Sequence, residues 1–283
     1  MSRMFFKGIL ASLLFTCFLQ AAVLQDAGVI VNDPNGYLSW KPANDALSVY
    51  CWFKISAPSG KVITKNMTIL VNDTTGPSSN RYAYLIQFNA SSGNIEFLAE
   101  GATDSILMTL IEKPYVDRWY HVAVVREGNI FYPYVDGRDK PSVAKAIGDS
   151  GNTKGISIGG WGSTNYFSGE IQEIAIFQRS IAYMVSQLQF LDLKEEYHDY
   201  LNLTGYFKLS EQGRDKQFKN YAKNPPPGTT SGQKVGVGTI TVLTADQAVE
   251  QSLFDATKNG SDNVVVPLSG VFSRLDLMKK WDV

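Results

Sequence analysis

The feature that most constrains this chain is a two-residue alternation of apolar and polar side chains, repeated in short runs. Such alternation is typical of β-strands with one buried face. Loops rich in Asn, Asp, Ser and Gly separate the runs, as at residues 32–36 and 72–80. Regularly spaced short strands predict an all-β sandwich or barrel. The predicted strands cover residues 38–40, 48–55, 68–71, 82–88, 94–99, 105–110, 120–126, 130–135, 155–158 and 170–177.

The first residues have the layout of a secretory signal peptide. The apolar run 9–19 follows Arg3 and Lys7, and two alanines at positions 21 and 22 offer a cleavage site. The run is only about half of the ~20 residues that a membrane-spanning helix needs. We therefore interpret residues 1–22 as a signal peptide, with an uncleaved anchor as the alternative. This predicts a secreted protein, extracellular or periplasmic, without a membrane span in the mature chain.

Composition supports a globular exported domain. Hydrophobic residues make up 44% of the chain and charged residues 19%, which provides material for a sizeable core. Removing the signal peptide leaves 24 lysines and arginines against 27 acidic residues. No basic field remains to attract nucleic acid, so we expect no nucleic-acid partner. Cys51 is then the sole cysteine, and we expect a buried packing residue without a disulfide.

Motifs between residues 117 and 209 identify a family. The run 117–125 reads Asp-Arg-Trp-Tyr-His-Val-Ala-Val-Val, and Phe-Tyr-Pro-Tyr-Val-Asp-Gly follows at 131–137. Ile-Ser-Ile-Gly-Gly comes next at 156–160, then Phe-Ser-Gly-Glu-Ile-Gln-Glu-Ile-Ala-Ile-Phe at 167–177, and Leu-Thr-Gly-Tyr-Phe-Lys-Leu at 203–209. In this order the pieces resemble laminin-G-like domains of the concanavalin A-like lectin and glucanase superfamily. The resemblance covers residues 28–232 and implies a two-sheet antiparallel jelly-roll sandwich.

The predicted organisation is a sandwich domain over residues 23–232 and an extension over residues 233–283. Within the sandwich, helical spacing of apolar residues between 181 and 200 predicts one short peripheral helix. In the extension, a weak strand pattern at 235–242 precedes a capping box that opens a helix at 244. We expect a short α/β extension that packs on the sandwich, with docking of a partner as the alternative.

Catalysis requires a constellation that the sequence does not provide. Glycosidases on this type of fold need two carboxylates flanking the scissile bond. The nearest candidates are Glu170 and Glu173, whose three-residue separation predicts opposite faces of a strand. No nucleophile elbow, zinc-binding helix or phosphate-binding loop occurs either. We therefore predict a protein that is not an enzyme, with a glycoside hydrolase kept as the less favoured alternative.

The resemblance implies binding of a glycan or of an extracellular or surface protein. For a sugar we single out Trp161, Asn165 and Tyr166, because aromatic rings stack on sugar rings and an amide bonds hydroxyl groups. A Trp161 packed over the sandwich edge is the alternative. Calcium (Ca2+) is the cofactor that the family suggests, and Asp33 and Asp73 are the candidate ligands. As turn-forming residues, both aspartates also have a purely structural explanation.

Overall fold

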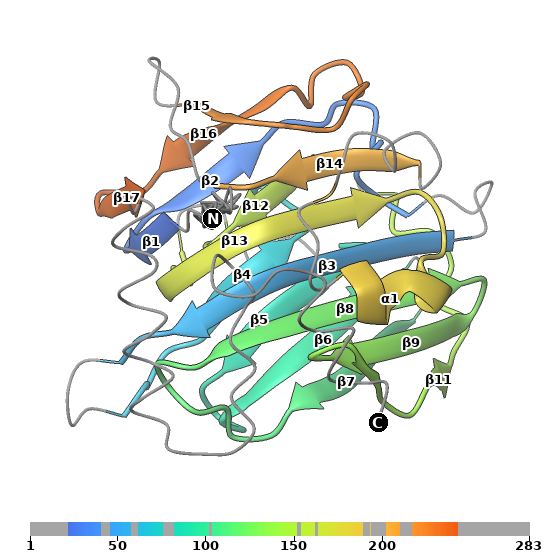
Figure 1. The fold of residues 1–283 in the computed structure, drawn as a ribbon, viewed down its shortest axis with the longest axis horizontal. Helices are drawn as coiled ribbons and strands as arrows, with labels where there is room; N and C mark the ends of the chain where they lie inside the picture. The colour runs from blue at the N-terminus through green and yellow to red at the C-terminus, as the bar shows by residue number, and fades with distance from the viewer. Residues whose placement is uncertain are drawn as a thin grey trace, which may run out of the picture.

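The structure is a computed structural model that describes residues 22–40, 46–57, 62–75, 82–101, 104–151, 154–161, 164–188, 193, 202–209 and 217–242. Two antiparallel sheets face each other and form a sandwich, as Figure 1 shows. Sheet A has nine strands and sheet B has eight. The predicted all-β, two-sheet jelly-roll architecture is confirmed.

Sheet A is built around three long strands that lie side by side. In spatial order it contains β10 (Arg138–Asp139), β9 (Ile130–Val135), β8 (Trp119–Glu127), β3 (Ala46–Ile55), β13 (Ser168–Phe177), β1 (Ala22–Gln25) and β17 (Thr239–Val242), with β11 (Val143–Ala144) on β9 and β14 (Leu203–Phe207) on β13. Sheet B contains β15 (Gln217–Lys219), β16 (Ser231–Val235), β2 (Gly28–Val31), β12 (Ile156–Ile158), β4 (Met67–Val71), β5 (Leu85–Asn89), β6 (Asn94–Glu100) and β7 (Ser105–Ile111).

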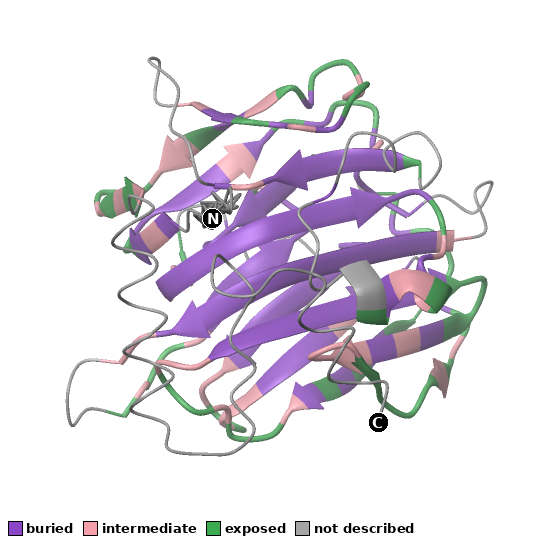
Figure 2. Ribbon diagram, viewed as in Figure 1, coloured by how far each residue is buried: buried purple, intermediate pink, exposed green. Residues whose placement is uncertain are grey.

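The core lies between the two sheets, because alternate residues of every long strand point inward. In β3 the inward set includes Val49, Cys51 and Phe53, which are at most 1% exposed. The Cys51 thiol is buried among apolar side chains as predicted, and desolvation raises its pKa far above the usual range. Figure 2 shows the central strands buried along most of their length, with the exposed residues concentrated in the loops and at the edges.

The opposite face of sheet A carries a second apolar cluster. It gathers Tyr50, Ala175, Phe177 and Tyr206 under a short helical segment, η2 (Ala182–Met184) followed by α1 (Val185–Leu188). This segment is the predicted peripheral helix. The rest of the predicted span, except Leu193, lies outside the described residues.

Local predictions fail where side chains override the pattern. Residues 38–40 form turns instead of a strand, since the Leu38 N–H donates to the Asp33 carboxylate at 2.6 Å. The predicted strand 82–88 begins only at Leu85. β16 continues past residue 232, and β17 pairs with β1 in sheet A. Residues 233–242 therefore belong to the sandwich, whereas the helix predicted from residue 244 lies outside the described residues.

Candidate functional site

The three residues predicted to bind sugar are divided between two places. Trp161 is buried, 6% exposed, and its indole ring packs edge-on against Tyr82 on the outer face of sheet B. Its Nε1 donates a 2.8 Å hydrogen bond to the Asp73 carboxylate. Trp161 therefore packs against the sandwich, which was the alternative to a sugar-binding role. Its ring offers no open face for a sugar.

Asn165 and Tyr166 lie at the end of the sandwich where β4 begins. The Asn165 carbonyl accepts the Thr68 N–H at 2.8 Å, and its backbone has a positive φ of 49°. Tyr166 is partly exposed and lies so close to Gly236 that an added Cβ there would be 2.7 Å from its ring. Desolvation and the nearby Asp26 raise the Tyr166 pKa. Both residues are partly exposed, and the Asn165 backbone is held by the hydrogen bond from Thr68.

The two candidate calcium ligands, Asp33 and Asp73, already accept hydrogen bonds from backbone and side-chain groups of the protein. Asp73 accepts Trp161 Nε1 and the Thr75 N–H and hydroxyl, and Asp33 is buried with Oδ2 bonded to the Leu38 N–H. Within the described residues, no three His, Cys, Asp or Glu side chains gather as a metal site. Calcium takes six to eight oxygen ligands, so Asp33 and Asp73 alone would not complete a site. Calcium binding stays a prediction.

The packing of Trp161 leads to a first prediction. Trp161→Phe removes the donor from a buried carboxylate, so we expect the free energy of unfolding to fall by about 2 kcal/mol. Chemical denaturation monitored by circular dichroism measures this change. Sugar binding, where it exists, should survive, because the indole is not exposed. Loss of sugar binding without loss of stability would instead indicate that Trp161 contacts the sugar.

A cluster of polar and aromatic side chains lies on the outer face of sheet A, beside the second apolar cluster. Sequence analysis did not predict this cluster. Lys54 Nζ lies 2.6 Å from Glu170 Oε1 and 5.4 Å from the centre of the Trp119 ring. His121 lies between Trp52 and Tyr50, with ring centroids 5.1 and 5.2 Å away. These side chains are buried despite facing away from the core.

A bulge in β13 brings the two glutamates to this same face. The pairing with β3 shifts register between Gln172 and Ala175, and Glu173 has a positive φ of 51°. Glu170 pairs with Lys54, and Glu173 accepts the Tyr206 hydroxyl, which belongs to the outer cluster. The prediction that Glu170 and Glu173 point to opposite faces is wrong, because a bulge interrupts the two-residue alternation. Each carboxylate is engaged by a structural partner.

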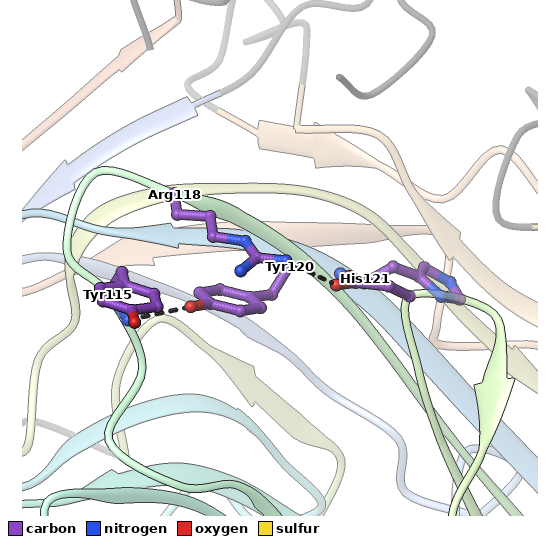
Figure 3. A network of polar contacts seen from close by, with 5 residues as sticks. Tyr115, Arg118, Tyr120 and His121 are labelled. Carbon is purple, nitrogen blue, oxygen red and sulfur yellow. Dashed lines mark hydrogen bonds and ion pairs between the residues drawn. The ribbon is translucent and has the colours of Figure 1, made fainter. Parts of the chain in front are cut away.

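The loop from residue 112 to residue 118 closes one end of the sandwich and joins sheet B to sheet A. Three hydrogen bonds hold its backbone. The Lys113 N–H donates to Asn94 Oδ1 at 3.1 Å, and the Tyr115 N–H donates to the Tyr120 hydroxyl at 2.9 Å. The Asp117 N–H donates to the Ile55 carbonyl at 2.7 Å. Figure 3 shows the Tyr115–Tyr120 bond. The loop is thus fixed through its main chain.

Some side chains of this loop are exposed to solvent, although its backbone is fixed by hydrogen bonds. Tyr115 is 70% exposed, and the neighbouring Val116 is exposed as well. The Arg118 guanidinium lies 4.8 Å from the centre of the Tyr120 ring and 3.3 Å from Asp136 Oδ2, and Figure 3 shows it directly above that ring. An exposed aromatic ring and an oriented guanidinium therefore lie on one rigid loop.

Asp136 connects this loop to the strand behind it. Its Oδ1 accepts the His121 N–H at 2.9 Å while Oδ2 faces Arg118. Desolvation raises the Asp136 pKa, and the hydrogen bond from His121 and the charge of Arg118 oppose that rise. Asp136, in the turn after β9, thus also orients Arg118.

Fold and loop geometry define an antiparallel β-sandwich protein with an accessible aromatic loop at one end. The sequence profile of the concanavalin A-like lectin/glucanases superfamily matches residues 25–182, more than half of the chain. The chain belongs to this superfamily. No curated protein sequence matches it.

Solved structures share the fold at low sequence identity. A candidate carbohydrate-binding protein from Bacteroides ovatus is 18% identical with a TM-score of 0.55, over 80% of this chain and 60% of that protein. A CBM40 domain of a Ruminococcus gnavus sialidase, bound to sialyllactose, is 12% identical (TM-score 0.41; 58% and 97% covered). Domains LG4–5 of the mouse laminin α1 chain are also 12% identical (TM-score 0.41; 56% and 40% covered). No described helix is long and apolar enough to cross a membrane.

Proposed function

We propose that this chain is an exported, non-catalytic module that binds carbohydrate through the loop at residues 112–118. The observation that carries the proposal is the exposed ring of Tyr115 on a loop whose main chain is fixed by hydrogen bonds to both sheets. A loop whose main chain is already fixed loses little backbone freedom when a ligand stacks on its exposed side chains, which favours binding.

The chemistry beside Tyr115 suits a sugar. Aromatic faces pack on the apolar faces of sugar rings, and correctly placed polar groups supply orientation. Arg118 offers N–H donors to hydroxyl or carboxylate oxygens, and its side chain is one-third exposed. The accessible Asn165 and Tyr166 at the same end are proposed to extend the contact surface.

The absence of catalysis is supported by the state of the two glutamates. Glu170 is ion-paired with Lys54, and Glu173 accepts the Tyr206 hydroxyl. A typical glycoside hydrolase needs one carboxyl group free to donate a proton and one free to attack or to activate water. The alternative binding function is adhesion to an extracellular protein, which the exposed Val116 beside Tyr115 favours. Calcium is proposed only as an accessory, tested by chelation.

The test compares matched tyrosine variants on a glycan array, with calcium and with chelator. Tyr115→Ala keeps the backbone N–H that anchors the loop, so the fold should persist. We expect its binding to weaken by about tenfold or more, since one aromatic contact contributes about 1.4 kcal/mol. Tyr183→Ala, at an exposed tyrosine in η2, should bind as the unaltered protein does. Equal binding by both variants would refute the assignment of the loop.

A further inference from the structure

Strand β7 forms one edge of sheet B and lacks the usual protection of edge strands. Among the described strands it pairs with β6 on one side and with none on the other. Its seven residues include neither a charged residue nor a proline, the devices by which natural edge strands resist pairing. The other edge of this sheet, β15, is only three residues long and ends in Lys219. Among the described strands, β7 is therefore the long edge of sheet B without a charged residue or proline.

The outward face of this edge is apolar as well. Leu107 is 58% exposed, in the middle of β7. The strand register aligns it with three apolar neighbours on the same face, in the order Val71, Leu85, Leu98 and Leu107. An apolar row that runs to an exposed leucine at an open edge indicates a surface that gains by being covered.

We propose that two copies of this chain associate through β7, in antiparallel pairing about a two-fold axis. Such an axis preserves the faces of the sheets, so outward side chains meet outward side chains. Pairing centred on Leu107 places the two exposed leucines opposite each other and Ser105 opposite Thr109 of the second copy. Cross-strand pairs of this kind stabilise sheets. The unpaired backbone groups of both edges are satisfied at the same time.

Charges flanking the strand disfavour one alternative register. Asp104 precedes β7 and forms a 2.9 Å ion pair with Lys145, while Glu112 follows the strand. Centring the pairing on Met108 would put Asp104 of one copy opposite Glu112 of the other, and opposed like charges are destabilising. Centring on Leu107 places Asp104 opposite Leu110 and avoids that repulsion. A second copy therefore suits the edge in length, polarity and charge.

The arrangement has a consequence that rests on the proposed function. The loop at residues 112–118 follows the C-terminal end of β7, and antiparallel pairing places the C-terminal ends of the two strands at opposite ends of the interface. The two Tyr115 rings would then face away from each other. Such a dimer bridges two glycan-bearing surfaces instead of gripping one surface with both sites.

Sedimentation of the full chain at micromolar concentrations tests the proposal without any glycan, so it succeeds or fails independently of the sugar site. We expect about twice the chain mass for the unaltered protein. Leu107→Lys should raise the dissociation constant by about tenfold or more, because the two like-charged ammonium groups would lie opposite each other. Thr109→Lys, at another exposed position of β7, should also weaken the dimer, because a lysine on an edge strand disfavours pairing.

Val237→Lys is the matched control, since Val237 is fully exposed in the turn between β16 and β17. This variant should stay dimeric, and circular dichroism should be the same for all variants. A monomeric unaltered protein across the concentration range would overturn the proposal. So would a dimer that persists in both β7 variants.

Discussion

Replacing Lys54 by Met should lower the free energy of unfolding by about 3–5 kcal/mol, the range observed when one partner of a buried ion pair is removed. The Lys54 side chain is 1% exposed and that of Glu170 is 9% exposed, with 2.6 Å between their charged atoms. Without this ammonium, the Glu170 carboxylate stays buried and poorly hydrated. Urea titration followed by intrinsic fluorescence measures the loss.

Two comparisons make the Lys54 prediction specific. Lys65→Met removes a surface ion pair, in which Lys65 is 58% and Asp26 54% exposed at 3.1 Å, and should cost less than about 1 kcal/mol. Combining Lys54→Met with Glu170→Leu should recover most of the lost stability, because neither charge of this pair is left buried without its partner. Equal losses for Lys54→Met and Lys65→Met would contradict the buried pairing.

Acidification should destabilise the protein through His121, with a loss of about 3 kcal/mol between pH 7 and pH 4 from this residue. Burial lowers the His121 pKa from 6.5 to about 3. Its two ring nitrogens have no hydrogen-bond partner among the described residues. In the unfolded chain the His121 imidazole therefore binds a proton near pH 6.5. In the folded chain it stays neutral until about pH 3. The contribution of neutral His121 to stability is therefore fully present above pH 6.5. It is lost as the pH falls from 6.5 towards 3.

His121→Leu isolates this effect, because carboxylates elsewhere titrate in both proteins. The stability of the unaltered protein should fall more steeply than that of the variant between pH 6.5 and pH 4, as measured by urea titration at each pH. At pH 7 the variant should be as stable or more stable, since two unsatisfied polar atoms disappear. Parallel pH profiles would show that the His121 ring is not buried in neutral form.

Much of the fold was predictable because β-strand periodicity survives wherever one face is buried. The run 48–55, rich in β-branched and aromatic residues, was predicted as a strand, and the structure gives β3 over Ala46–Ile55 with Val49, Cys51 and Phe53 inward. The hairpin of β8 and β9 follows from its motif and its Gly-containing turn. Short strands such as β1 and β2 were not predicted, because four residues carry too little pattern.

The candidate site was less accessible to sequence reasoning. The positive φ of Glu173 leaves no mark in the sequence, yet it brings two glutamates to one face. Trp161 gave an aromatic signal, but its burial depends on Asp73, which is distant in sequence. Tyr115 lies in a polar segment between two strands, beside Pro114. An aromatic residue in a short loop was the available signal, and the hydrogen bonds that fix the loop required the structure.

The most direct test of the central claim is an NMR titration of the isotope-labelled protein with the oligosaccharide that binds best on the array. We predict shifts in the amide signals of residues 112–118 and of Asn165 and Tyr166, while the anomeric signals of the sugar keep their number. Shifts confined to other surfaces, or new anomeric signals from a cleaved glycosidic bond, would contradict a non-catalytic sugar site at this end of the sandwich.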